Sequence, residues 1–169
     1  MRKEVADAAA DSEQPAGRRP ERYEGKFVFE DVHFVYPTEK QKKVLRGLSF
    51  CVEPGQKVAL VGKAGCGKST AITLVQRFYD VVSGSISLDG HPLASYDLHH
   101  LRAHTGVVAQ ENILFSATIR ENICYGMGAN GLPAPTDEMV AAACEAANAH
   151  EFIAEFPQGL STLMVRNFD

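Results

Sequence analysis

Apolar and polar residues alternate with two different periods along this chain, and the periods separate expected strands from expected helices. Residues 27–36 are rich in aromatic and β-branched side chains, which favours a strand that ends at Pro37. A second strand, either bent or split into a pair, is expected over residues 44–52. The short apolar run Lys-Val-Ala-Leu-Val at residues 57–61 is typical of a buried strand. This part of the chain is therefore expected to be mainly sheet.

The first expected helix follows a turn and a glycine-rich segment. Residues 53–56 place Pro and Gly at the centre of a type II turn, which leads into residues 57–61. Residues 69–79 carry apolar side chains at roughly helical spacing. The sheet is therefore expected to be antiparallel at first and then parallel, with the strand-to-helix connection inside the glycine-rich segment.

Short elements alternate in the middle of the chain. Residues 84–88 alternate polar and apolar side chains and end in an Asp-Gly pair at 89–90, which predicts a half-exposed strand and a tight turn. Asp97 can cap a short helix that ends at His104. Residues 105–109 are expected to form a small strand.

The remaining part is expected to be helical. Residues 118–121 read Thr-Ile-Arg-Glu, a capping box that predicts a helix to about residue 125. Thr136 caps a stronger helix, and residues 151–156 form another short helix before Pro157. The residues expected to face the core from the stronger helix are Met139, Val140, Ala143, Cys144 and Ala147.

Composition narrows the class of protein. The 169 residues are enough for one ordinary domain, and a net charge of −4 argues against a general nucleic-acid binder, which needs a basic face. The four cysteines are far apart, which argues against structural zinc and favours reduced thiols on the cytosolic side. No apolar run reaches the ~20 residues that span a bilayer. Residues 1–24 show no sustained apolar period and are expected to be a flexible linker or tail, with the folded domain over 25–169.

The glycine-rich segment fits the pattern G-x-x-x-x-G-K-[ST] of a phosphate-binding loop, and it lies between an expected strand and an expected helix. Its backbone N–H groups would curl around phosphate oxygens, because glycines allow a close approach. Lys68 would reach the β- and γ-phosphates, the Ser69 hydroxyl would bind Mg²⁺, and the positive end of the helix would face the same anion. The alternative is a glycine-rich turn with an incidental lysine. The candidate residues are Gly62, Lys63, Ala64, Gly65, Cys66, Gly67, Lys68, Ser69 and Thr70.

Two other interpretations are weaker. His100 and His104 are one helical turn apart and suggest a metal site, but no acidic or cysteine ligand is expected beside them, so surface histidines are preferred. Another phosphate-loop enzyme, such as a small-molecule kinase or a GTPase, is disfavoured because the chain has neither an Asn-Lys-x-Asp motif nor an arginine-rich lid.

Several segments in a fixed order indicate a family resemblance. They are Phe-Val-Tyr-Pro at residues 34–37, the phosphate-binding loop, Val-Ala-Gln-Glu at 108–111 and residues 115–123. In this combination the chain resembles the nucleotide-binding domain of an ABC transporter, from about residue 27 to residue 163. The resemblance implies an α/β fold, with a P-loop NTPase (RecA-like) core and an antiparallel β subdomain. Residues 146–159 are similar to those of subfamily B exporters, which include multidrug, peptide and mitochondrial types.

The resemblance also implies roles for individual residues. Tyr36 matches the aromatic residue that stacks on adenine, and Val44 belongs with the nucleotide-binding residues. Gln110 matches the glutamine that joins Ser69 as a Mg²⁺ ligand and lies towards the membrane domains. The implied cofactors are ATP and Mg²⁺. The implied partners are the transmembrane domains of an exporter and a second nucleotide-binding domain, at the cytosolic or matrix-side face of a membrane.

The chain departs from the family pattern after Gly159. The signature motif, the Walker B strand ending in Asp-Glu and the switch histidine are expected beyond this point, but the sequence ends at Asp169 without them. We therefore expect weak ATP binding without the ABC-type ATPase activity in this chain alone. An exposed edge at residues 57–61 should also make the chain marginally stable or aggregation-prone. The hypotheses that stay open are the N-terminal half of an exporter ATPase domain and a non-catalytic regulator that pairs with a full-length transporter half.

Overall fold

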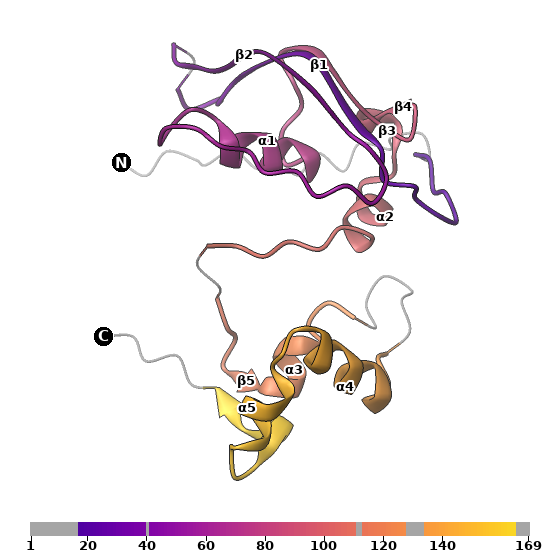
Figure 1. Cartoon of the computed structure of the whole chain (residues 1–169), viewed down its shortest axis with the longest axis vertical. Coiled ribbons are helices and arrows are strands. Elements are labelled where there is room, and N and C mark those ends of the chain that lie inside the picture. Colours follow the sequence, from indigo (N-terminus) through magenta and orange to yellow (C-terminus); the bar gives the residue numbers. More distant parts are fainter. Residues whose placement is uncertain (1–16, 40, 111–112, 128–133, 165–169) are drawn as a thin grey trace, which may run out of the picture. The chain divides into compact units, whose positions relative to one another are not determined.

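The computed structural model describes residues 17–39, 41–110, 113–127 and 134–164. The chain divides into two units, Met1–Val107 and Val108–Asp169, each with its own hydrophobic core (Figure 1).

The first unit is built on a four-stranded antiparallel sheet in the order β2-β1-β3-β4. Phe29 at the centre of β1 lies opposite Phe50 of β2 and Ile86 of β3, and the Phe29 and Phe50 rings stack with centroids 4.3 Å apart. The second expected strand is therefore one strand, whose register against β1 shifts between Phe29 and Val32. The strands are β1 (Phe27–Val35), β2 (Lys43–Val52), β3 (Ser83–Leu88) and β4 (His91–Pro92).

The turns that connect these strands follow the sequence pattern. The N–H of Gln56 donates to the carbonyl of Glu53 at 3.0 Å, and Gly55 has the positive φ of 72° that the third position of a type II turn requires. Asp89 and Gly90 both have positive φ, 50° and 76°, as in the tight hairpin turn expected between β3 and β4. Both turn predictions are confirmed.

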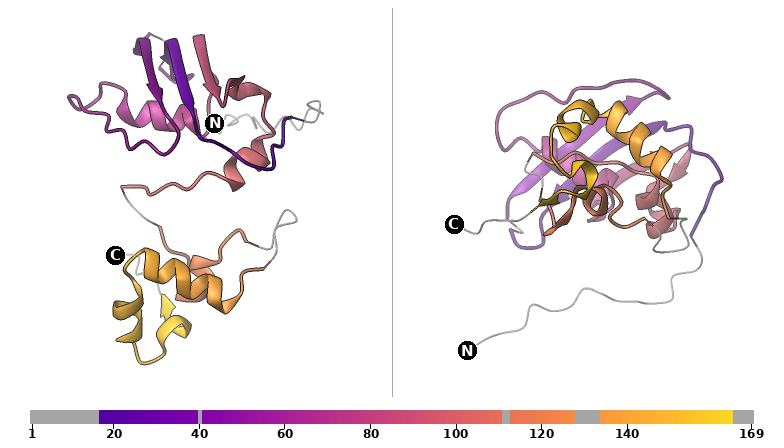
Figure 2. Two further views of the ribbon diagram at one scale, coloured as in Figure 1. Left: turned by 45° about the vertical axis from the view of Figure 1, so that its right-hand side comes forward. Right: turned by 90° about the horizontal axis from the view of Figure 1, so that it is seen from below.

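Helix α1 (Lys68–Val75) packs against one face of the sheet (Figure 2). Ala71 and Leu74 are both 1% exposed and join the core formed by Phe29 and Phe34 of β1. Removal of this apolar surface from water is the main stabilising contribution of the unit. Helix α1 is shorter than the expected 69–79, because Arg77 adopts a left-handed conformation with φ 52° and ends it.

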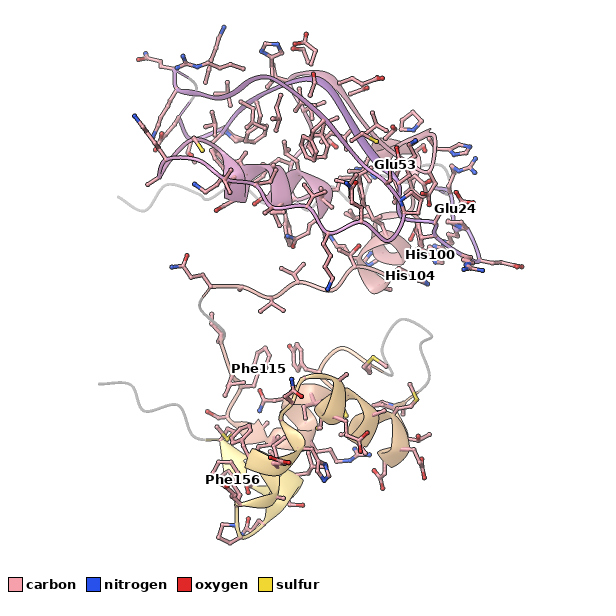
Figure 3. All side chains as sticks on the ribbon, viewed as in Figure 1. Glu24, Glu53, His100, His104, Phe115 and Phe156 are labelled. Carbon is pink, nitrogen blue, oxygen red and sulfur yellow. The ribbon has the colours of Figure 1, made fainter. Side chains whose placement is uncertain are left out.

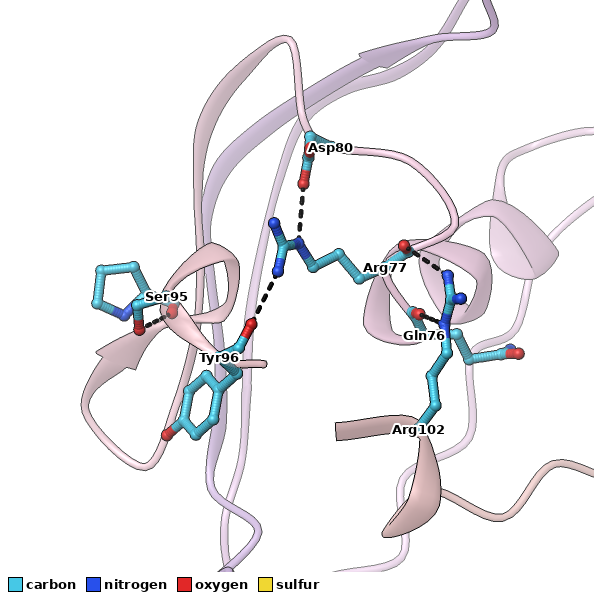
Figure 4. A network of polar contacts seen from close by, with 7 residues as sticks. Gln76, Arg77, Asp80, Ser95, Tyr96 and Arg102 are labelled. Carbon is cyan, nitrogen blue, oxygen red and sulfur yellow. Dashed lines mark hydrogen bonds and ion pairs between the residues drawn. The ribbon is translucent and has the colours of Figure 1, made fainter. Parts of the chain in front are cut away.

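Arginine side chains bind the carbonyls of the two residues that follow α1 (Figure 4). Arg102 donates through Nε to the carbonyl of Gln76 at 3.2 Å and through Nη2 to the carbonyl of Arg77 at 3.0 Å. Arg77 donates to the carbonyl of Tyr96 at 3.0 Å and to the carboxylate of Asp80 at 3.3 Å. Helix C-terminal carbonyls have no partner within their own helix, so these donors fix the end of α1 to the segment that follows β4.

That segment forms η1 (Leu93–Ser95) and α2 (Leu98–Ala103). The carboxylate of Asp97 accepts the N–H of His100 at 2.8 Å, which confirms the predicted cap. The same carboxylate pairs with the guanidinium of Arg19 at 2.9 Å. The hydrogen bond from His100 and the pairing with Arg19 hold the pKa of the Asp97 carboxyl below its usual value.

Residues from Gly17 onward lie against α2. The N–H of Arg18 donates to the carbonyl of Ser95 at 2.8 Å, and His100 Nε2 donates to the carbonyl of Pro20 at 2.9 Å. Figure 3 shows His100 beside His104, whose ring is 4.3 Å from that of His100 and 5.3 Å from that of Tyr23. The described part of the expected linker is therefore packed on the first unit. The domain boundary at residue 25 stays a prediction.

The predictions of two further strands are wrong. Residues 57–61 and 105–109 do not form strands, and no described strand pairs with either segment. Val61 is 87% exposed and Val108 is 90% exposed. A parallel strand is buried only when neighbouring strands and covering helices flank it, and the described residues supply none at these segments. The low stability and the tendency to aggregate stay predictions. Their physical basis is this exposed apolar surface.

The second unit is small and mainly helical. The capping box is confirmed: Thr118 Oγ1 accepts the N–H of Glu121 at 3.1 Å, and the Glu121 carboxylate accepts the N–H of Thr118 at 2.8 Å. Thr136 Oγ1 accepts the N–H of Met139 at 3.3 Å and caps the longest helix of this unit, as expected. The elements are β5 (Ala117–Thr118), α3 (Ile119–Ile123), α4 (Asp137–Ala146), α5 (His150–Ala154), η2 (Gly159–Ser161) and β6 (Leu163–Met164), with β5 and β6 antiparallel.

The buried stripe of α4 is narrower than expected. Val140 and Cys144 are buried with Ile119 and Ile153, and Phe156 packs beside them (Figure 3). The other expected core residues, Met139, Ala143 and Ala147, are exposed. A core this small covers only the part of the helix that faces it. No described helix is long and apolar enough to cross a membrane.

Replacing Asp97 tests the cap and its charge separately. Asp97→Asn keeps a capping side chain and loses the charge, whereas Asp97→Ala loses both, so at pH 7 we expect the alanine variant to unfold about 1–2 kcal/mol more easily than the native chain and the asparagine variant about 0.5–1 kcal/mol more easily. The pKa of this carboxyl is lower in the folded chain, so its contribution is present above pH 3.8 and is lost as the pH falls through the folded value. Urea unfolding from pH 7 to pH 3 should therefore show the native and Asp97→Asn stabilities converging at the acid end. A constant difference would contradict the assignment.

Candidate functional site

The candidate site begins at the loop between Val61 and α1. Gly67 is the residue before the helix and has a left-handed conformation, with φ 99°. A Cβ at Gly67 would lie 2.5 Å from Leu45 Cδ2 and 3.3 Å from the carbonyl oxygen of Val44, both in β2. Gly65 also has a positive φ of 77°, but a Cβ there would meet nothing within 4 Å. The motif therefore needs glycine at position 67 for both conformation and space, and at position 65 for conformation alone.

Lys68 folds back over this loop. Its ammonium donates to the carbonyl of Gly62 at 2.8 Å and to the carbonyl of Lys63 at 2.9 Å, and it lies 3.8 Å from the Sγ of Cys66. An ammonium has three donors, and these three contacts use all of them. The positive charge is thus held at the loop, where the motif predicts phosphate binding.

A hollow of about 240 Å³ opens beside the loop. It brings the aromatic residue predicted from the family resemblance together with the loop, although Tyr36 and Lys68 are far apart in the sequence. Ser69, the predicted Mg²⁺ ligand, also lines the hollow. The lining residues are Tyr36, Glu39, Lys42, Val44, Gly65, Gly67, Lys68, Ser69 and Thr70.

Tyr36 has a defined setting in this hollow. Its hydroxyl lies 3.0 Å from Thr70 Oγ1, and its ring meets those of Phe34 and Tyr79 edge-on at 5.0 Å and 5.4 Å. Thr70 itself is only 5% exposed. The ring is therefore fixed between the end of β1 and the first turn of α1.

Glu39 and Lys42 belong to the hollow but were not predicted. The N–H of Glu39 donates to the carbonyl of Tyr36 at 3.0 Å, and the N–H of Lys42 donates to the carbonyl of Glu39 at 2.9 Å. These turns bring both side chains to the rim, where Lys42 Nζ lies 3.4 Å from the Glu39 carboxylate. Both side chains are mostly exposed, so the pair contributes little to stability. The available sequence signal was the closeness of both residues to Tyr36.

The other predicted residues lie outside the hollow. Ala64 and Cys66 are exposed parts of the same loop. Gln110 is exposed and belongs to the second unit, so its role as a Mg²⁺ ligand stays a prediction. His100 and His104 do not form a metal site with a third ligand: within the described ranges no group of three or more His, Cys, Asp or Glu side chains could hold a metal ion.

Comparison with known proteins decides the family. The family profile described as "ABC transporter" matches residues 45–165. The chain belongs to the ABC transporter family. This ABC domain is 47% identical over 154 residues to "ABC multidrug transporter MDR2" of Trichophyton equinum, and equally so to "Multidrug resistance protein 4" of Entamoeba histolytica. The matches cover 91% of this chain but 11% and 12% of those relatives, so the chain spans about a tenth of their length.

A solved structure confirms the fold class. This ABC domain superposes with a TM-score of 0.78 and 37% identity on the structure titled "Structure of a bacterial Atm1-family ABC exporter with ATP bound". The match covers 89% of this chain and 25% of the other. The predicted P-loop NTPase fold, mixed α/β with an antiparallel sheet, is therefore confirmed.

Two alanine substitutions in the ABC domain's loop form a matched pair. In Gly67→Ala, the new Cβ clashes with Leu45 and the β2 backbone, and the alanine must also adopt an unfavourable left-handed conformation. In Gly65→Ala only the left-handed conformation is unfavourable, because the new Cβ has space. We expect Gly67→Ala to lower the free energy of unfolding by about 1–3 kcal/mol more than Gly65→Ala, measured by urea denaturation. Equal losses would show that β2 does not constrain the loop.

Proposed function

We propose that this chain binds ATP with Mg²⁺ as part of the ATPase domain of an ABC exporter. The observation that carries the proposal is the hollow that joins Tyr36, Lys68 and Ser69 at the start of α1. It combines an aromatic face, a cation and a hydroxyl, which suit the base, the phosphates and the metal ion of a nucleotide.

At the phosphate end of the proposed site, positive charge would attract the nucleotide's phosphates. The Lys68 ammonium would exchange its carbonyl contacts for β- and γ-phosphate oxygens, which are stronger acceptors because they are charged. The N-terminal end of α1 carries a partial positive charge that favours the same anion. The Ser69 hydroxyl would hold Mg²⁺, which neutralises phosphate charge when bound, and Gln110 is the proposed second protein ligand.

At the other end of the proposed site, the nucleotide base would stack on an aromatic ring. Tyr36 supplies an aromatic ring, and the rings of Phe34 and Tyr79 lie nearly perpendicular to it. Val44 adds an apolar contact from β2. Stacking tolerates any aromatic base, so this end would select for a base without reading its edges.

We propose binding without hydrolysis for this chain alone. Among the described residues that line the hollow, Glu39 is the only carboxylate, and it pairs with Lys42 at the exposed rim. Phosphoryl transfer to water needs a group that orients the attacking water, and this paired carboxylate is a poor candidate. Transport would then require partners. The proposed partners are exporter transmembrane domains and a second nucleotide-binding domain, with the chain on the cytosolic or matrix-side face of the membrane.

Binding of a fluorescent ATP analogue, with and without Mg²⁺, tests the proposal. Lys68→Ala removes a charged hydrogen-bond donor and should weaken binding about 10- to 100-fold. Tyr36→Ala removes both the stacking surface and the hydroxyl and should weaken it about 10- to 100-fold. Lys57→Ala, which removes an exposed lysine outside the hollow, is the control and should have no effect. Native affinity in both site variants would overturn the proposed site.

A further inference from the structure

Thr70 makes an unusual contact for a threonine in a helix. It is the one polar residue that is buried among those the structure describes, and its hydroxyl lies 3.0 Å from the hydroxyl of Tyr36, 34 positions earlier in the sequence. For Thr70, the third residue of α1, the carbonyl four residues earlier belongs to Cys66 and lies outside the helix, whereas a threonine further along a helix can donate to the carbonyl four residues before it. Thr73 in the same helix does this, donating to the carbonyl of Ser69 at 2.9 Å. The Thr70 hydroxyl instead joins α1 to the segment that follows β1.

The contacts of Tyr36 leave its ring little freedom. Phe34 is 2% exposed and meets the ring at an interplanar angle of 85°, and Tyr79 meets it at 90°. These two nearly perpendicular contacts restrain the ring, and the hydrogen bond to Thr70 restrains its hydroxyl end. Without that bond the two edge contacts alone would set the tilt of the ring. The hydroxyl of Tyr36 is therefore the group that fixes the ring relative to α1.

Thr70 also lies close to the phosphate end of the site. It is two residues after Lys68 in the same helical turn, so a hydrogen bond to Thr70 fixes Tyr36 relative to Lys68 as well. The base-binding and phosphate-binding parts come from separate segments of the chain, and a nucleotide must meet both at once. A small change in their separation would weaken binding of the whole nucleotide but not of its phosphates alone.

We propose that the Tyr36–Thr70 hydrogen bond is a positioning device that holds the base-stacking ring in register with the phosphate-binding loop. Thr70 is then a positioning residue that acts through Tyr36. The bond favours ligands that carry both an aromatic base and a polyphosphate over ligands that carry only one. This inference rests on the proposed nucleotide binding.

Two near-isosteric variants remove the bond from either side. Tyr36→Phe keeps the ring, and Thr70→Val keeps the branched shape of the side chain. Dissociation constants are measured for a fluorescent ATP analogue and, by competition, for inorganic tripolyphosphate, which has no base. We expect each variant to weaken ATP-analogue binding about 3- to 10-fold, as the loss of one hydrogen bond predicts, and to leave tripolyphosphate binding unchanged. The double variant should bind the ATP analogue with about the same affinity as the single variant that binds it less tightly, because both substitutions remove the same bond.

Thr73→Val is the matched control. It removes a threonine hydroxyl from the same helix whose partner lies within the helix, and it should leave both constants unchanged. Unchanged ATP-analogue binding in Tyr36→Phe and Thr70→Val would overturn the inference, and so would an equal loss for both ligands or an additive loss in the double variant. Should Thr70→Val fail to fold, Tyr36→Phe decides the question alone. Failure of the native chain to bind either ligand would instead refute the proposed function.

Discussion

The packing of α1 against the antiparallel sheet is the interaction on which the rest of the first unit depends. Ala71 and Leu74 are almost fully buried against Phe29 and Phe34, and this contact sets where the helix begins and ends relative to the strands. The position of the phosphate-binding loop follows from this packing, because the loop is the segment that enters the helix.

Both ends of α1 are fixed by specific residues. At its start, Gly67 lies so close to Leu45 and Val44 that a side chain has no space. Just after its end, Arg102 of α2 donates to the carbonyls of Gln76 and Arg77 and so connects the two helices. A helix held at both ends can present Lys68 at a constant distance from Tyr36. Preorganisation of this kind lowers the entropic cost of ligand binding.

The local elements could be predicted from the sequence where local chemistry decides them. The caps at Asp97 and Thr118 and the turn at 89–90 depend on residues within a few positions of each other, and all are confirmed. The expected strands at 57–61 and 105–109 failed because strand formation depends on partners elsewhere in the chain, which apolar composition does not reveal.

Sequence reasoning singled out most, but not all, of the residues that line the hollow. The loop motif identified Lys68 and Ser69, and the family resemblance identified Tyr36 and Val44, all of which line one hollow. Glu39 and Lys42 were missed because no pattern marks exposed residues that a turn brings to the rim. The hydrogen bond between Tyr36 and Thr70 was also beyond prediction, since a bond between distant residues depends on how the helix packs on the sheet.

Hydrogen–deuterium exchange of the chain with and without Mg-ATP tests the central claim most directly, because it reports on every backbone amide at once. If the start of α1 and the segment around Tyr36 form one nucleotide site, Mg-ATP will slow exchange in residues 62–71 and around residue 36, and will leave the described residues from 113 onward largely unchanged. Slower exchange only elsewhere in the chain, or no change at all at saturating Mg-ATP, would contradict the account.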